Sequence, residues 1–93
     1  MVSRFEVGRR VAAARIAHGM TRHQLSLRIN VDPHTIGRIE RGDVFQRIDV
    51  LSRISNVLEV SLNWIAFGNH PPKADREFMR LLVTDEQRRE TKG

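Results

Sequence analysis

The segment 32-DPHTIGRIERG-42 decides the expected fold, because it contains a complete set of signals for one short helix. Asp32 is a good N-cap residue, and Pro33 stands at the first helical position, where its missing N–H removes no intrahelical hydrogen bond. The closing glycine ends the helix. Within it, Ile36 and Ile39 form the only apolar stripe. A helix that buries two isoleucines leaves most of its surface for a partner.

A shorter predicted helix precedes this segment. Thr21 begins a T-x-x-Q capping box, which indicates a helix over residues 21–28. Its apolar positions are Leu25 and Ile29, which we expect to face inward. Asn30 tolerates left-handed backbone angles and closes a tight turn. Two short helices joined by a turn of about three residues form a helix-turn-helix unit.

A longer helix is predicted before this unit. Ser3 and Glu6 form an S-x-x-E capping box, and Gly19 ends the helix. The apolar stripe between these signals consists of Val7, Val11, Ala14 and His18. The sequence therefore predicts a separate helix directly before the helix-turn-helix unit.

Two further helices are predicted after the unit, beyond the loop at residues 43–47. The stripe of the fourth helix consists of Ile48, Leu51, Ile54 and Leu58. The fifth helix begins at Ser61 and ends at Gly68. Its inward positions are Leu62, Trp64 and Ile65. No segment has the alternating pattern of a strand, so the predicted fold class is all-α.

The C-terminal part has a different character. The NHPPK segment at residues 69–73 interrupts the helical pattern, and a short last helix is expected over roughly residues 74–83. Its apolar residues are Phe78, Leu81 and Leu82. The expected organisation is thus a five-helix domain at residues 3–68, followed by a linker, a short helix and a polar tail at residues 69–93.

Composition limits the possible classes of protein. Apolar residues make up 40% of the 93, which is enough for one modest core, and there is no cysteine to form a disulfide or a thiolate metal site. The first residues do not form a signal peptide, because Arg4, Arg9, Arg10 and Arg15 interrupt any apolar run. No run approaches the roughly 20 apolar residues of a membrane span. We expect a cytoplasmic protein without a membrane segment.

The positive charge lies in one half of the chain. Residues 1–47 contain nine arginines and four acidic residues, whereas residues 48–93 contain seven basic and seven acidic residues, so the net charge of +5 belongs to the first half. A one-sided basic surface is typical of a polyanion binder, although an arginine-rich protein without such a partner has the same composition.

These features together resemble the Cro and phage-repressor group of helix-turn-helix proteins. The resemblance rests on RRVAAARIAHGMT (9–21), QL (24–25), VDPHTIGRIERG (31–42) and LSRISNVLEVSLNWIAFG (51–68), and it covers about residues 3–68. It implies a repressor-like domain that binds double-stranded DNA through the 33–41 helix. It also implies a homodimer, since one short helix reads few bases.

The chain departs from the usual pattern of this group at four positions. Arg22 stands where glutamine is usual, and Ser26 where alanine is usual. Asn30 and Glu59 stand where glycine is usual, in the turn and before the fifth helix. None of these residues removes a core position. Arg22 changes a contact that faces DNA in this group.

The outward side of the 33–41 helix is the predicted base-reading surface. It carries Pro33, His34, Gly37 and Arg38. Arginine can grip guanine with two hydrogen bonds, and histidine can contact a base or a phosphate. Gly37 costs about 1 kcal/mol relative to alanine within a helix. It either lets the helix approach DNA closely or stands at a neutral, exposed position.

The predicted phosphate contacts flank this surface. They are Arg22, Thr35, Arg41, Gln46 and Arg47. Each of the charged residues has solvated charge as its alternative explanation. By resemblance, Arg15 and Glu40 have a different role, as a structural salt bridge that joins the first helix to the end of the third. We therefore do not count them as DNA contacts.

The sequence gives no support for catalysis. His18, His23, His34 and His70 lack the i, i+4 spacing of a helical metal site, and no glycine-rich phosphate loop is present. Glu40 and Asp43 lie among arginines and do not form a convincing acid–base pair. We predict no enzyme activity, no metal and no cofactor.

The predicted function is that of a DNA-binding transcriptional regulator, a repressor that binds a palindromic operator as a homodimer. The region 62–82 is the candidate dimer interface, with docking of the last helix onto its own domain as the alternative. A second possible function is that of an antitoxin, which would also bind a partner protein through the C-terminal region. A third is a protein-interaction module that does not bind DNA.

Overall fold

The computed structural model describes residues 3–69 of the protein, and these residues form five helices and no strand. The helices are α1 (Arg4–Ala17), α2 (Arg22–Ile29), α3 (Pro33–Arg41), α4 (Ile48–Leu58) and α5 (Leu62–Phe67). This confirms the predicted all-α, five-helix architecture. The expected last helix and polar tail lie outside the described residues.

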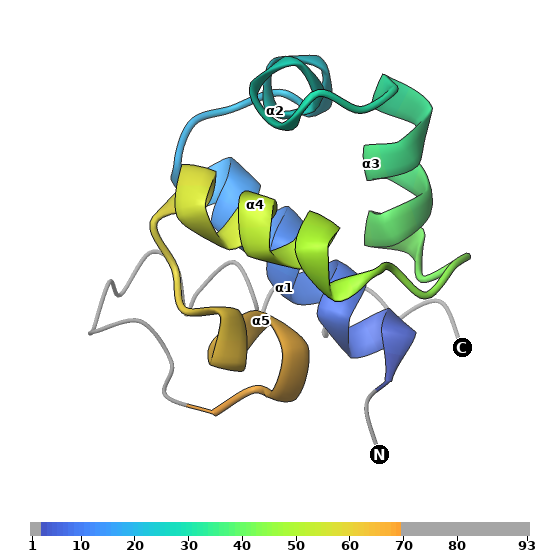
Figure 1. Cartoon of the computed structure of the whole chain (residues 1–93), viewed down its shortest axis with the longest axis vertical. Helices are drawn as coiled ribbons and strands as arrows, with labels where there is room; N and C mark the ends of the chain where they lie inside the picture. The colour runs from blue at the N-terminus through green and yellow to red at the C-terminus, as the bar shows by residue number, and fades with distance from the viewer. Residues whose placement is uncertain (1–2, 70–93) are drawn as a thin grey trace, which may run out of the picture.

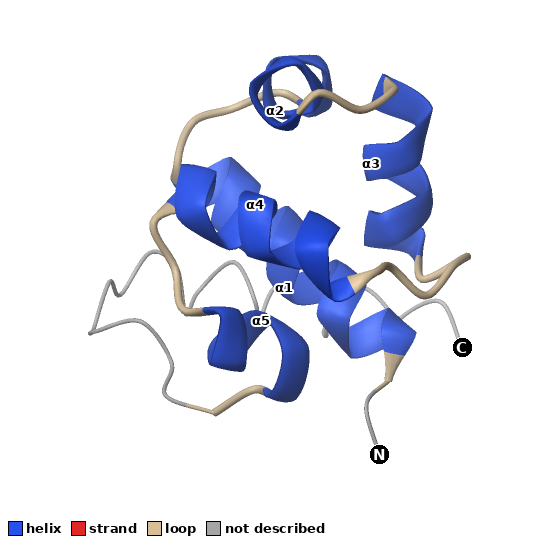
Figure 2. Ribbon diagram, viewed as in Figure 1, coloured by secondary structure: helices blue, strands red, loops and turns tan. Residues whose placement is uncertain are grey.

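The helices surround one core. Figure 1 shows α2 at one end of the molecule and α5 at the other, with α1 and α4 between them and α3 along one side. The fully buried side chains come from every helix, and they include Val11, Leu25, Ile29, Ile36, Ile39, Ile54 and Ile65. Figure 2 shows that the connections between these helices are loops. None of the described helices has the length and apolar content needed to cross a membrane.

The N-terminal ends of α1, α2, α3 and α5 follow the predicted capping signals, whereas Arg47 at the start of α4 makes no capping hydrogen bond through its side chain. At α2 the Thr21 hydroxyl accepts a hydrogen bond from the Gln24 N–H at 3.0 Å, and the Gln24 side chain accepts one from the Thr21 N–H at 2.9 Å. At α3 the Asp32 carboxylate accepts the His34 N–H at 2.8 Å. Ser3 caps α1 through the Glu6 N–H. These local contacts explain why the helices start where the sequence predicts.

Two helices end on a residue other than glycine in the left-handed region. Asn30 ends α2 with φ 58°, and Glu59 ends α4 with the same φ. Asparagine visits this region readily, whereas a glutamate there costs on the order of 1 kcal/mol. The left-handed backbone conformation therefore costs more at Glu59 than at Asn30, so Glu59 is the more strained of the two residues.

Two predicted core positions are wrong. His18 is the C-cap of α1 and is exposed, with its Nε2 3.6 Å from the Glu59 carboxylate, because the helix ends at Ala17 and the stripe ends with it. Ile48 is the first residue of α4 and is 60% exposed, and Val50 is buried instead. The spacing of apolar residues predicts which side of a helix faces the core, but it does not predict whether the first or last turn of that helix reaches the core.

The helix α1 supports α3 at very short range. A Cβ atom on Gly8 would lie 2.7 Å from the Glu40 carbonyl oxygen and closer still to that of Ile39. Gly8 is buried, so the two backbones nearly touch at this crossing. Any larger residue would push α3 away from α1.

Two arginine side chains donate hydrogen bonds to backbone carbonyl groups near the C-terminal ends of other helices. The Arg10 Nε donates to the Ile65 carbonyl oxygen at 2.9 Å, near the end of α5. Burial lowers the pKa of the Arg10 guanidinium, with Glu6 opposing the effect and Arg9 adding to it. The Arg53 guanidinium donates to the Ile29 carbonyl oxygen at 2.7 Å, at the end of α2. Part of the arginine content therefore stabilises the fold.

Candidate nucleic-acid interface

The outward side of α3 carries an exposed group of polar side chains. Pro33, His34 and Arg38 are exposed, and Thr35 is partly buried beside them. The opposite side of the same helix faces the core through Ile36 and Ile39. The N-cap and the packing thus fix α3 while leaving its first two turns open to a partner.

Gly37 differs from the prediction. It is buried in the free protein, and is not the exposed position that the sequence suggested. A Cβ atom at Gly37 would lie 3.1 Å from Nη1 of Arg41. The physical reason for its burial is therefore the guanidinium of Arg41, which lies over the helix surface that a side chain would occupy.

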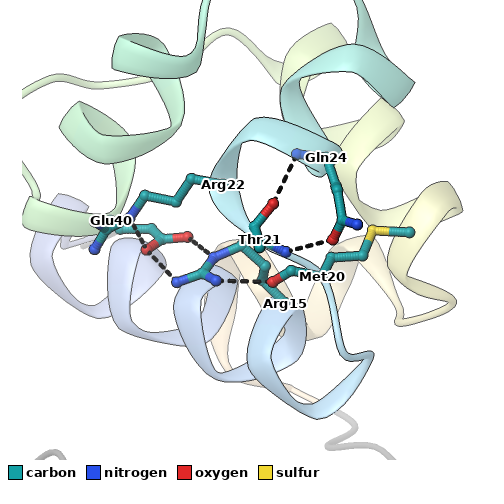
Figure 3. Close-up of polar contacts among 6 residues, drawn as sticks. All are labelled: Arg15, Met20, Thr21, Arg22, Gln24 and Glu40. Carbon is teal, nitrogen blue, oxygen red and sulfur yellow. Dashed lines mark hydrogen bonds and ion pairs between the residues drawn. The ribbon is translucent and has the colours of Figure 1, made fainter.

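A three-residue ion network links the helix-turn-helix unit to α1 (Figure 3). The Arg15 guanidinium donates to both oxygens of the Glu40 carboxylate, from Nε at 2.6 Å and from Nη2 at 3.1 Å. The Arg22 Nε donates to Oε1 of the same carboxylate at 2.9 Å. The Glu40 side chain is 3% exposed, and its charge is compensated by the guanidinium groups of the two arginines.

The Arg15 side chain also stabilises the connection between α1 and α2. Its Nη1 donates to the Met20 carbonyl oxygen at 2.8 Å, just before the cap of α2. Only 12% of the side chain is exposed. Arg15 thus joins α1, the α1–α2 turn and α3, and it is poorly accessible to a phosphate.

Sequence reasoning missed one part of this network. Arg22 was expected only as a phosphate contact, yet it pairs with Glu40 across the helix-turn-helix unit. Its side chain is 53% exposed, because only Nε faces the carboxylate. The one signal for this pairing was the arginine in place of the usual glutamine. Arg22 therefore has a structural contact and an accessible guanidinium edge.

The other predicted phosphate residues cluster around the α3–α4 loop. Arg41 pairs with Asp43 at 3.0 Å, and Arg47 pairs with Asp49 at 3.4 Å, both at exposed positions. Gln46 is partly buried and lines a cavity of about 60 Å³. The remaining lining residues are Arg4, Val7, Ile39, Val44, Phe45 and Leu51. The arginines on the two sides of this loop are thus each paired with an acidic residue in the free protein.

Residues 3–69 contain no group of three or more histidine, cysteine, aspartate or glutamate side chains that could hold a metal ion. The Glu40 carboxylate is 3% exposed and is paired with Arg15 and Arg22. The chemistry offered by this surface is that of hydrogen-bond donors and positive charge.

The comparison with protein families agrees with this geometry. A helix-turn-helix family model matches residues 11–65, which span the chain from the middle of α1 to α5. The chain belongs to the helix-turn-helix family of the Cro and phage-repressor type, and it is a DNA-binding protein. The family is a DNA-binding family whose members are typically not enzymes. Neither the curated proteins nor the solved structures contain a match to the chain.

Proposed function

We propose that this protein is a transcriptional repressor that binds a palindromic operator as a homodimer. The observation that carries this proposal is the exposed side of α3, where Pro33, His34 and Arg38 lie together on a helix whose other side is fixed in the core. A helix of this kind fits the major groove of B-form DNA. The proposed site of action is the cytoplasm.

The proposed reading residues have different roles. Arg38 lies one turn from the start of α3 and donates two hydrogen bonds to a guanine edge. His34 contacts a base edge nearer the helix N-terminus, and Pro33 makes an apolar contact beside it. Within the described residues, neither the His34 nor the Arg38 side chain takes part in a hydrogen bond or an ion pair, so both can bind DNA without breaking a contact of the fold.

The proposed phosphate contacts set the position of α3 in the groove. They are Arg22, Thr35, Gln46 and Arg47. Arg22 keeps its Nε on Glu40 and offers its outer N–H groups to the DNA backbone. All four contacts strengthen binding to all sequences alike. The contacts of the two arginines also release condensed counterions, so they make binding depend on salt.

Dimerisation is proposed through the region 62–82. Within the described residues this region contains Leu62, which is partly buried, and Phe67, which is 57% exposed. Deletion of residues 74–93 is expected to weaken operator binding through loss of the dimer while the five-helix domain stays folded. Analytical ultracentrifugation of both forms tests this, and a full-length chain that is monomeric at tens of micromolar, roughly the range of weak dimers, would exclude the interface.

The deciding experiment is selection of bound sequences from random duplexes, followed by footprinting at the promoter of the protein's own gene. A repressor of the proposed kind enriches a two-fold symmetric site and protects it. Copurification of a small protein encoded next to it would support an antitoxin instead. Equal affinity for all duplexes would exclude sequence-specific regulation.

A further inference from the structure

The middle of α3 has a notch that is filled by a side chain from its own C-terminal end. Gly37 lacks a side chain. Apart from its chain neighbours and the backbone of α3 itself, the three atoms nearest to the place of a Cβ all belong to Arg41. Nη1 would lie at 3.1 Å, Cζ at 3.8 Å and Nη2 at 3.9 Å. The guanidinium therefore lies one turn before the Cα atom of Arg41, as expected for a helical side chain that leans towards the N-terminus.

A second contact fixes this arrangement from the other side. The Arg41 Nε donates to the Asp43 carboxylate at 3.0 Å. Because Nε is engaged, the two Nη groups form the accessible edge of the guanidinium. The Arg41 side chain as a whole is 58% exposed in the free protein.

The position of Arg41 around the helix axis places it among the proposed reading residues. At about 100° per residue, positions 33, 34, 37, 38 and 41 fall on one face about 140° wide. Position 41 lies near the centre of this face, between Pro33 and Arg38. The buried residues Ile36 and Ile39 point to the other side.

We infer that Arg41 is a further base-reading residue, and that Gly37 and Asp43 position its guanidinium over the middle of α3. The inference rests on the proposed function, and it changes the predicted roles of both residues. Arg41 reads a base rather than holding a phosphate, and Gly37 contacts no base itself. The planar Nη edge fits the O6 and N7 acceptors of guanine in the major groove.

The proposed placement of Arg41 explains why a glycine stands at position 37, within a helix. Glycine within a helix costs about 1 kcal/mol relative to alanine, and no left-handed backbone angle requires it at position 37. An alanine methyl group would displace the flexible end of Arg41 rather than any backbone. The glycine is thus unfavourable for the helix and favourable for the placement of Arg41.

The test uses full-length protein and selection from a random duplex library. The variants are Gly37→Ala, Arg41→Ala and their combination, with Arg28→Ala as the control on an exposed arginine of α2. Both single variants are expected to lose preference at the same base pair of each half-site, with an affinity loss of about tenfold on the wild-type site. The double variant should lose no more than Arg41→Ala alone, because both changes remove one contact.

Two further measurements separate positioning from folding. Gly37→Ala should keep or raise the thermal midpoint, so its altered preference cannot come from unfolding. Arg41→Lys should keep the salt dependence of binding while it loses the base preference, since a single ammonium group cannot grip guanine as the guanidinium does.

Two results would overturn the inference. One is an unchanged base preference in Gly37→Ala together with an equal loss on all duplexes in Arg41→Ala, which would make Arg41 a backbone contact. The other is a wild-type protein that enriches no sequence at all. The second result would also remove the proposed function, whereas the first would leave it intact.

Discussion

The two sides of α3 differ in what they contact. The inner side is in near backbone contact with Gly8 of α1, and it buries Ile36, Ile39 and the Glu40 carboxylate. The outer side carries His34 and Arg38, which are exposed. The difference implies that substitutions on the inner side change stability, whereas those on the outer side change binding at constant stability. Each prediction below tests that separation.

The largest effect is expected at the crossing of α1 and α3. In Gly8→Ala the new methyl group meets the carbonyl oxygens of Ile39 and Glu40, and these backbone atoms cannot rotate away. Overpacking of this kind should destabilise the fold by about 3 kcal/mol, the upper part of the usual range. Thermal denaturation followed by circular dichroism should show a midpoint lower by more than about 10 °C.

The matched control is the same substitution on the outer side of α3. In Gly37→Ala only the end of the Arg41 side chain has to move, so the midpoint should stay or rise. Equal midpoints for the Gly8 and Gly37 variants would mean that α1 and α3 do not approach as closely as described, and the contrast between the two sides would be lost.

The next effect concerns the buried ion network. Arg15→Ala leaves Glu40 with the single Nε contact of Arg22 and removes the hydrogen bond to the Met20 carbonyl. Removal of one partner from a buried pair is costly, and the remaining arginine reduces the cost, so we expect a loss of about 2–3 kcal/mol in the free energy of unfolding. Chemical denaturation measures it, with Arg28→Ala as the exposed control. A variant as stable as the control would make Arg15 a candidate phosphate contact.

The local features of the fold could be predicted from the sequence. Thr21, Asp32 and Ser61 cap their helices as expected, because a capping residue acts on N–H groups two or three positions away. Gly42 and Gly68 end their helices in the left-handed region for an equally local reason. Signals that act within one turn can be read from a single segment.

Contacts between distant segments could not be predicted in this way. The need for Gly8 arises only when α1 crosses α3, and nothing near residue 8 indicates that crossing. The pairing of Arg22 with Glu40 joins residues 18 positions apart. The exposure of Ile48 depends on where α4 begins relative to the core. In each case the deciding atoms belong to another element.

The third prediction addresses the outer side directly. Arg38→Ala should cost about 1–3 kcal/mol in binding to the selected operator and relax the preference at one base pair of each half-site. Its thermal midpoint should match that of the wild type, because Arg38 is exposed and takes part in no ion pair among the described residues. Binding titrations of Arg38→Ala and the wild type on operator and scrambled duplexes measure whether the loss of affinity is specific to the operator. An equal loss on both would show that Arg38 does not read sequence, and His34 would become the leading candidate.

The smallest effect is expected at Arg22, which belongs to both sides. Its Nε contacts the buried Glu40 carboxylate, while about half of the side chain faces solvent. Arg22→Ala should therefore lower stability only slightly, by roughly 0.5–1 kcal/mol, as for other half-exposed pairs. It should also weaken binding to operator and scrambled duplexes alike, and reduce the slope of log affinity against log salt by about 1 for the lost phosphate contact.

The variant Arg22→Gln separates these two roles, because glutamine is the usual residue of the family at this position and has no charge. It can still donate a hydrogen bond to Glu40 or to a phosphate, but it releases no counterion. We expect it to recover part of the stability lost in Arg22→Ala while it keeps the reduced salt slope. An unchanged salt slope in both variants would make Arg22 a purely structural residue. The whole ion network of Arg15, Arg22 and Glu40 would then act on stability alone, as the inner side of α3 does.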